Sequence, residues 1–128
     1  MRNYEDLHVW RKAHTLTLAI YKATRCFPNE ERFGLTSQMR RSCASIGANL
    51  AEGCGRRSEG EMARFVHIAM GSGAELSYHL RLARDLELLS AASSEHFRSE
   101  LNEVMRMLSA LLQRLKPRSE VVQLRAKG

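Results

Sequence analysis

Apolar residues recur along this chain at steps of three and four, in four successive segments. Since an α-helix has about 3.6 residues per turn, this spacing puts the apolar side chains of each segment on one face of a helix. No alternating pattern typical of a β-strand is convincing. The sequence therefore predicts an all-α fold, with helices over approximately residues 7–27, 34–54, 58–89 and 94–115.

Helix-stopping and helix-starting residues bound these segments. Pro28 ends the first and Pro117 ends the fourth, because the residue before a proline is pushed out of the helical region. Ser58 and Glu61 form the capping-box pattern, which satisfies free amides at the start of a helix. The connections between segments are short, and short connections make neighbouring helices antiparallel. We therefore expect an up-down-up-down antiparallel four-helix bundle.

The length of the chain, 128 residues, is enough for one domain with one hydrophobic core. We expect the bundle to occupy residues 1–115. Residues 116–128 have no sustained apolar period, and they carry four basic side chains against one acidic side chain, a net charge of +3. We interpret them as a basic C-terminal tail that is disordered when alone.

Several bulk features argue against particular classes of protein. Cys26, Cys43 and Cys54 are odd in number and have no Cys-x-x-Cys spacing, which argues against a disulfide framework and against a zinc site. No apolar run approaches the roughly 18 to 20 residues that a membrane span needs. The N-terminus lacks the apolar core of a signal peptide. We expect a cytoplasmic protein that does not contact a membrane.

The chain is basic and rich in arginine. Its formal net charge is +6, from 20 Lys and Arg residues against 14 Asp and Glu residues, and 16 of the 20 are arginine. Arginine holds phosphate with a planar fork of donors, so this balance suits a nucleic-acid partner. An arginine-rich genome composition with solvated surfaces accounts for the charge equally well. Aromatic residues make up only 6%, which disfavours base stacking and favours phosphate contacts. The candidate RNA- or DNA-binding residues are Arg40, Arg41, Arg56, Arg57, Arg64, Lys116 and Arg118.

Small and polar side chains fill much of the second segment, where serine, alanine and glycine let helix backbones approach closely. Ser72 and Gly73 offer a similar smooth surface, which we expect to face the second segment. Such residues suit either a buried hydrogen-bond network or a flat contact between subunits. The candidates for this network or oligomer interface are Ser45, Ala48, Asn49, Glu52, Ser72, Glu75 and His79.

Catalytic and metal-binding motifs are harder to find. Four-helix bundles often hold two metals through paired Glu-x-x-His motifs, but this chain has one Glu75/His79 pair at a spacing of four and no second copy. A metal site made by Glu52, Glu75 and His79 is therefore less favoured than a hydrogen-bond network. No Gly-x-Ser-x-Gly, His-Glu-x-x-His or phosphate-loop motif occurs in the sequence. We expect no catalytic residue, no bound metal and no cofactor, and we do not expect an enzyme.

Four blocks of the sequence carry a resemblance to a known family. They are YEDLHVWRKA (4–13), IYKAT (20–24), FPNEERFGLTSQMRRSCASIGANLAEG (27–53) and FVHIAMGSGAELSYHLRLARDLELL (65–89). With them the chain resembles the four-helix-bundle family of proteins encoded in intervening sequences of 23S ribosomal RNA genes. The resemblance implies a bundle that assembles as a ring of five subunits. The family is distantly similar to the accessory variability determinant of diversity-generating retroelements, a pentameric barrel that binds nucleic acid and a reverse transcriptase.

Two classes of function stay open. The first is a non-catalytic, homo-oligomeric and pentameric protein that binds RNA or DNA through contacts between arginines and phosphates. The second is a structural or adaptor protein that interacts with another protein, such as a reverse transcriptase, and does not bind nucleic acid. The excess of arginine, the basic tail and the family's association with ribosomal RNA genes favour the first.

Overall fold

Four α-helices make up most of the computed structural model, which describes residues 2–115. No strand occurs within these residues, so the prediction of an all-α protein is confirmed for them. The predicted tail, with Lys116 and Arg118, lies outside the described residues. The helices are α1 (His8–Thr24), α2 (Leu35–Cys54), α3 (Glu59–Asp85) and α4 (Ala91–Leu115), with the short 3-10 turns η1 (Tyr4–Asp6) and η2 (Asn29–Glu31).

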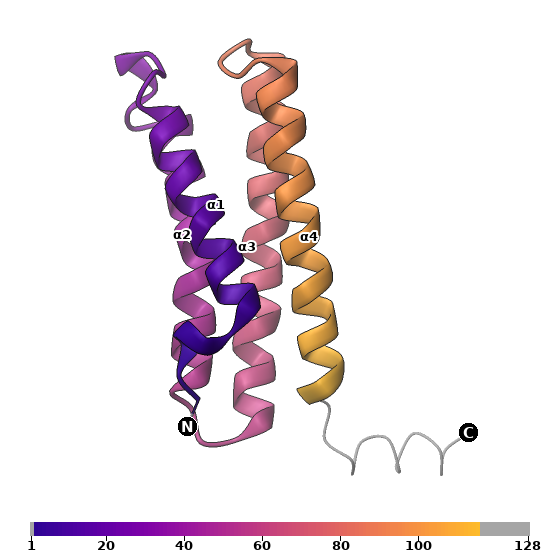
Figure 1. Cartoon of the computed structure of the whole chain (residues 1–128). Coiled ribbons are helices and arrows are strands. Elements are labelled where there is room, and N and C mark those ends of the chain that lie inside the picture. Colours follow the sequence, from indigo (N-terminus) through magenta and orange to yellow (C-terminus); the bar gives the residue numbers. More distant parts are fainter. Residues whose placement is uncertain (1, 116–128) are drawn as a thin grey trace, which may run out of the picture.

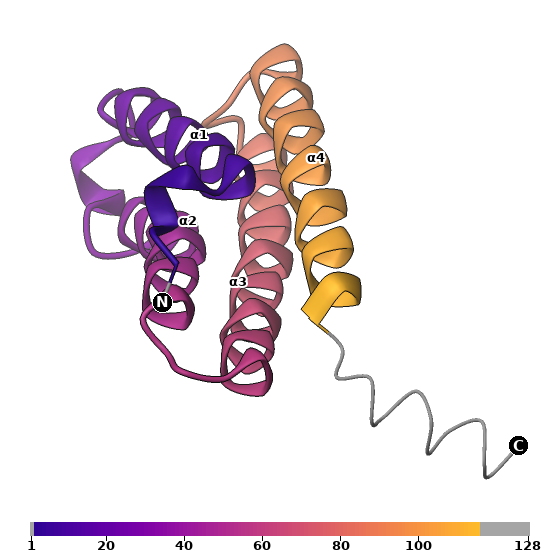
Figure 2. The same cartoon turned by 60° about the horizontal axis from the view of Figure 1, so that its bottom comes forward.

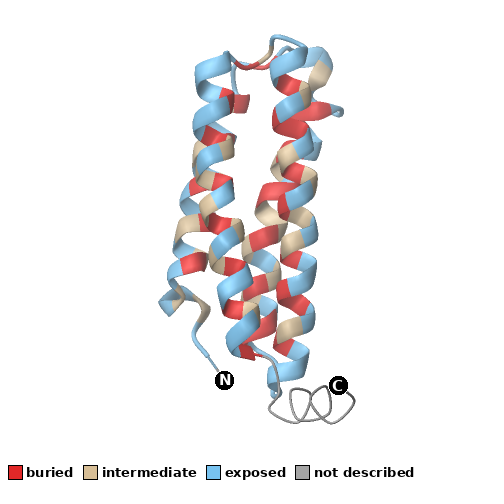
Figure 3. Cartoon of the chain, turned by 90° about the vertical axis from the view of Figure 1, so that its right-hand side faces the viewer, coloured by how far each residue is buried: buried red, intermediate tan, exposed pale blue. Residues whose placement is uncertain are grey.

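The helices pack as a bundle in the order α1, α2, α3, α4, and α4 returns to contact α1 (Figure 1). Helices α1 and α2 lie side by side, as do α3 and α4 (Figure 2). The buried residues lie mainly on the sides that the helices turn toward one another (Figure 3). Burying one large aliphatic side chain stabilises the fold by about 1.5–3 kcal/mol. The largest fully buried side chains are Ile20, Met39, Ile46, Leu50, Met62, Leu76, Leu80, Leu101, Leu108 and Leu115.

Helix α3 ends earlier than its apolar period predicts. Glu87 has a φ of 61°, in the left-handed region, and the amide of Leu88 bonds to the carbonyl of Ala83 at 2.8 Å. This closing turn satisfies carbonyl groups that the end of the helix would leave free. Leu89 follows the turn and is buried. The apolar pattern therefore continued to residue 89 because Leu89 belongs to the core, although it is not helical.

Two glycines mark places where helices approach closely. A Cβ atom on Gly53 would lie 3.0 Å from the Cβ of Phe65, so α2 and α3 are in tight contact at the C-terminal end of α2. A Cβ atom on Gly73 would overlap Met105 of α4. The prediction that Gly73 faces α2 is therefore wrong. Its neighbour Ser72 does face α2, and one residue further along a helix turns the side chain by about 100°.

Within residues 2–115, none of the helices is both long enough and apolar enough to cross a membrane.

Candidate nucleic-acid interface

The candidate interface begins where α2 ends and α3 starts. Ser58 is the N-cap of α3, and its hydroxyl oxygen accepts a hydrogen bond from the amide of Glu61 at 3.1 Å. This is the cap that the sequence predicts. Only four residues, 55–58, separate the two helices. Because the connection is so short and is capped, it holds Arg56 and Arg57 beside the first turn of α3.

Phe65 brings two of the predicted arginines together. The guanidinium carbon of Arg56 lies 4.9 Å from the centre of the Phe65 ring, and that of Arg64 lies 5.1 Å from it. Phe65 itself is buried, so its position is fixed by the core. A cation over an aromatic face is attracted by the ring electrons. The ring therefore holds two guanidinium groups from different elements in one region of the surface.

Arg2 joins this group from the N-terminus. Its amide donates to the carbonyl of Cys54 at 3.2 Å, and its guanidinium donates to Glu59 at 2.5 Å. Sequence analysis missed Arg2, although the expected antiparallel course would put the start of the first helix near the end of the second. A pocket of about 250 Å³ results, lined by Arg2, Cys54, Arg56, Arg57, Ser58 and Glu59. We call Arg2, Arg56, Arg57 and Arg64 the arginine end.

Carboxylates lie within the arginine end as well. Glu52 accepts a hydrogen bond from Arg56 at 2.9 Å, one turn earlier in the chain. Pairs this exposed stabilise a protein by only about 0–1 kcal/mol, so a phosphate can replace the carboxylate at small cost. Arg57 and Arg64 have no ion pair within residues 2–115. The free amides at the start of α3 add positive potential beside them.

Arg40 and Arg41 lie away from the arginine end, in the first half of α2. Arg40 donates to Thr24 at 2.9 Å and to the carbonyl of Tyr21 at 3.3 Å. It also lies over the Tyr21 ring, 4.8 Å from the ring centre. Arg40 therefore joins α2 to α1. The structure does not bring the predicted arginines of α2 together with those of the α2–α3 connection.

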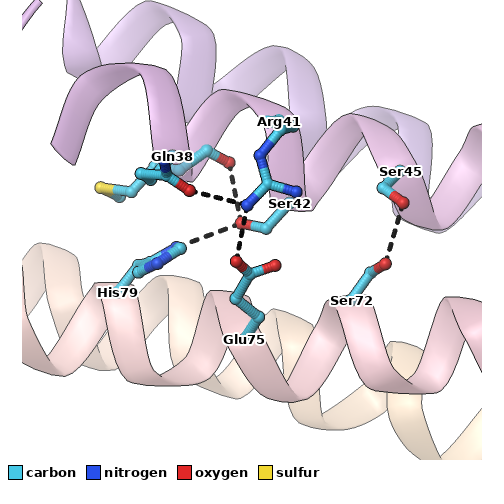
Figure 4. A network of polar contacts seen from close by, with 8 residues as sticks. Gln38, Arg41, Ser42, Ser45, Ser72, Glu75 and His79 are labelled. Carbon is cyan, nitrogen blue, oxygen red and sulfur yellow. Dashed lines mark hydrogen bonds and ion pairs between the residues drawn. The ribbon is translucent and has the colours of Figure 1, made fainter. Parts of the chain in front are cut away.

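Arg41 points the other way, toward α3 (Figure 4). Its guanidinium donates to Glu75 and to Gln38, each at 2.7 Å. Beside this pair, the hydroxyl groups of Ser45 and Ser72 are 2.8 Å apart, and Asn49 donates to Ser45 at 3.0 Å. Ser42 and His79 complete the group. We call this row of contacts between α2 and α3 the polar seam; it comprises Gln38, Arg41, Ser42, Ser45, Asn49, Ser72, Glu75 and His79.

Two of the residues predicted for a polar network or an oligomer interface lie outside the polar seam. Glu52 pairs with Arg56 rather than with the seam. Ala48 lines an apolar pocket of about 410 Å³ between α1 and α2, together with Trp10. Glu52, Glu75 and His79 therefore do not converge. Among residues 2–115, no group of three or more His, Cys, Asp or Glu side chains could hold a metal ion.

His79 is buried within the polar seam. Its Nδ1 atom lies 3.3 Å from the hydroxyl of Ser42, which donates to the carbonyl of Met39 at 3.2 Å. The Ser42 hydroxyl therefore lies within hydrogen-bond distance of two groups, the Met39 carbonyl and the Nδ1 atom of His79. Burial lowers the pKa of His79 below its ordinary value of 6.5; Glu75 raises it and Arg41 lowers it. The imidazole is neutral at neutral pH.

This environment makes stability depend on pH. The unfolded chain takes up a proton on His79 at a higher pH than the folded chain does, so the stability present above pH 6.5 is lost as the pH falls toward the lower folded pKa. We expect the free energy of unfolding to fall as the pH is lowered through 6.5. Urea unfolding at each pH measures it. His79→Asn, which keeps a hydrogen-bonding group near Ser42 but does not titrate, should flatten the curve. An equal slope in both proteins would contradict the assignment.

The buried cysteines are not suited to nucleophilic chemistry. Burial raises the pKa of Cys43 to about 11, and burial also raises the pKa of Cys54. A thiol attacks as its thiolate, and both groups stay protonated near neutral pH. Their surroundings are those of core residues.

The fold and this surface define a small all-helical bundle with an arginine-rich end. The chain belongs to the family of 23S rRNA-intervening sequence proteins, because the model of that family matches residues 5–110. The resemblance found in the sequence is thereby confirmed. No curated protein matches the chain.

A solved structure has the same fold. It is the crystal structure of a protein of unknown function from the S23 ribosomal protein family of Bacteroides thetaiotaomicron. The TM-score is 0.77, with 24% sequence identity over 82% of this chain and 95% of that chain. At this level of identity, the similarity shows the fold alone.

Proposed function

We propose that this protein is a non-catalytic, homo-oligomeric bundle that binds the phosphates of RNA or DNA through its arginine end. One observation carries the proposal: Phe65 holds Arg56 and Arg64 together beside Arg57 and the start of α3. A guanidinium fork fits two phosphate oxygens, and free helix amides favour the same anion. A cytoplasmic location is part of the proposal.

The expected binding is to the backbone rather than to the bases. Phe65 is buried beneath the two guanidinium groups, so it orients the arginines and is not free to stack on a base. Phosphate contacts position a nucleic acid without reading its sequence. The C-terminal end of α4 lies at the same end of the bundle as the α2–α3 connection (Figure 1). Lys116 and Arg118, which are candidate nucleic-acid-binding residues from the sequence, follow it in the chain.

The proposal includes assembly as a ring of five, which family membership supports. An up-down-up-down course of the chain is also part of it, supported by the short connections and the views in Figures 1 and 2. The pocket between α1 and α2 is a candidate contact between subunits. Leu18 on its edge is 58% exposed. Its floor on α2 consists of the small residues Ala44, Gly47, Ala48 and Ala51.

Changing Ala48 to arginine tests this contact. We expect Ala48→Arg to convert the oligomer to monomers. A long charged side chain would occupy the pocket between α1 and α2 and keep a second subunit from packing against it. Light scattering coupled to gel filtration measures the mass. Ser109→Arg adds the same side chain at an exposed position of α4 and should leave the mass unchanged. If Ala48→Arg had an unchanged mass, the assignment of this face as the subunit interface would be wrong.

Salt-dependent titration tests nucleic-acid binding. Labelled RNA hairpins and duplex DNA are titrated with the full chain, and fluorescence anisotropy is followed at several salt concentrations. We expect the affinity to fall steeply with salt, with a logarithmic slope of about −0.7 to −0.9 for each phosphate contacted. Absence of binding even at low salt would refute the proposal.

A second function would then be the better description. An adaptor that binds another protein, such as a reverse transcriptase, is favoured by the glutamates that pair with Arg2 and Arg56 in the isolated chain. A surface of paired, alternating charges suits a protein partner that supplies charges of both signs.

A further inference from the structure

A second polar pocket lies between the C-terminal part of α3 and the N-terminal half of α4. Its volume is about 420 Å³. Arg84 lies one residue before the end of α3, so the pocket is far along that helix from the arginine end. Its polar lining consists of Arg84, Ser94, Glu95, Arg98, Ser99 and Asn102.

Arg98 is half-buried in this pocket without a partner. It forms no hydrogen bond or ion pair with any residue of the described range 2–115, although the other half-buried cations there do. Lys12 pairs with two glutamates, and Arg40 donates to α1. Partial loss of water from a cation without a counter-charge is unfavourable. Arg98 therefore favours an anion in the pocket.

Arg84 supplies a second cation at the same place. It too has no ion pair within residues 2–115, and the nearby carboxylate of Asp85 is engaged by Arg81 at 3.0 Å. Two guanidinium groups from two helices thus line one pocket. Convergent arginines bind oxyanions more strongly than single ones, because each adds a charge-assisted hydrogen bond.

Glu95 restricts which anion fits. Its exposed carboxylate lines the pocket and has no ion pair within the part of the chain described. A carboxylate repels an anion that carries only acceptor oxygens, but it accepts a hydrogen bond from an anion that carries an O–H group. Inorganic phosphate keeps an O–H group at neutral pH, whereas sulfate has none.

We propose that the pocket between α3 and α4 binds a phosphate group that bears a hydrogen-bond donor, with Arg84 and Arg98 holding the charge and Glu95 accepting the hydrogen. Inorganic phosphate is the simplest such ligand, and a phosphomonoester with a neighbouring hydroxyl group is the other source of the same chemistry. The site shares no residue with the arginine end. It therefore stands whether or not the protein binds nucleic acid.

Titration with inorganic phosphate tests the site. The full chain, labelled with ¹⁵N, is followed by NMR at neutral pH and constant ionic strength, with sulfate and glycerol phosphate in parallel. We expect saturable shifts near Arg98, with a dissociation constant of about 1 mM or below and sulfate at least about tenfold weaker. Tighter binding of glycerol phosphate identifies the phosphomonoester as the ligand class; tighter binding of inorganic phosphate identifies the free ion.

Matched variants decide the roles of the side chains. Arg98→Gln should weaken phosphate binding by about tenfold or more, since a charged hydrogen bond is lost. Arg106→Gln, at an exposed position of the same helix outside the pocket, should bind as the original protein does. Glu95→Gln should bind sulfate as well as phosphate. Equal binding by the two arginine variants, with unchanged melting temperatures, would overturn the proposal, as would the absence of saturation.

Discussion

Reversing the charges of Arg56, Arg57 and Arg64 together is expected to weaken RNA binding by at least about a hundredfold at about 0.1 M salt. Each hydrogen bond to a charged group contributes about 1.5–3 kcal/mol, so the loss of three such contacts exceeds this change in affinity even at the lower value. The introduced glutamates also repel the phosphates. Fluorescence anisotropy of a labelled hairpin, at one fixed salt concentration, measures the effect.

The control is a second triple charge-reversal variant with the same net charge as the first. Three reversals lower the formal charge from +6 to 0, and the same reversal at Arg11, Arg25 and Arg106 does so at exposed positions that are not part of the arginine end. We expect the control to keep most of its affinity. Equal losses in the two variants would mean that only net charge matters. Thermal melting of both proteins is needed, because Arg56 and Arg64 cover Phe65.

Changing Gly53 to leucine is expected to lower the free energy of unfolding by about 2–3 kcal/mol. Even a Cβ atom at this position would lie 3.0 Å from the Cβ of Phe65, and a longer side chain has no space between α2 and α3. Overpacking of this kind forces the helices apart. Urea unfolding followed by circular dichroism measures the change.

Gly71 provides a control of opposite sign. It is exposed within α3, and a Cβ atom there would have nothing within 4 Å. Gly71→Ala should therefore raise the free energy of unfolding by about 0.5–1 kcal/mol, since alanine loses less backbone freedom in a helix. A loss of stability in this variant would indicate that another subunit packs on Gly71. An unchanged stability for Gly53→Leu would contradict the close approach of α2 and α3.

The helices could be predicted because their signals are local. The apolar period located all four, and Ser58 marked the start of α3. Ser45 and Asn49 could also be predicted correctly to lie near Ser72, because small and polar residues fill the second segment and Ser72 is expected to face it. Which side chain of α2 pairs with which of α3 could not be predicted, because the pairing depends on the register of α3 along α2.

The surface on which each arginine lies could not be predicted from its neighbours in the sequence, because it depends on how the helices pack. Arg40 and Arg41 are consecutive, but about 100° of rotation sends the first to α1 and the second to Glu75 on α3. Sequence analysis assigns both of them the same candidate role, in nucleic-acid binding. Arg84 and Arg98 lie far apart along the chain, and only the packing of α3 on α4 places them in one pocket.

The polar seam also sets which parts of the bundle can move. Sliding α3 by one turn, about 5.4 Å, would break the contacts of Ser42, Ser45 and Arg41 with α3 together, leaving polar groups without partners. Helices α2 and α3 are thereby locked in register as one rigid unit. Helix α1 is also tied to this unit, by hydrogen bonds of Arg40 and Thr17, whereas the hydrogen bond of Ser94 to Leu80 is the only one between the described part of α4 and this unit. A rearrangement that accompanies assembly or ligand binding is therefore accommodated most easily by α4.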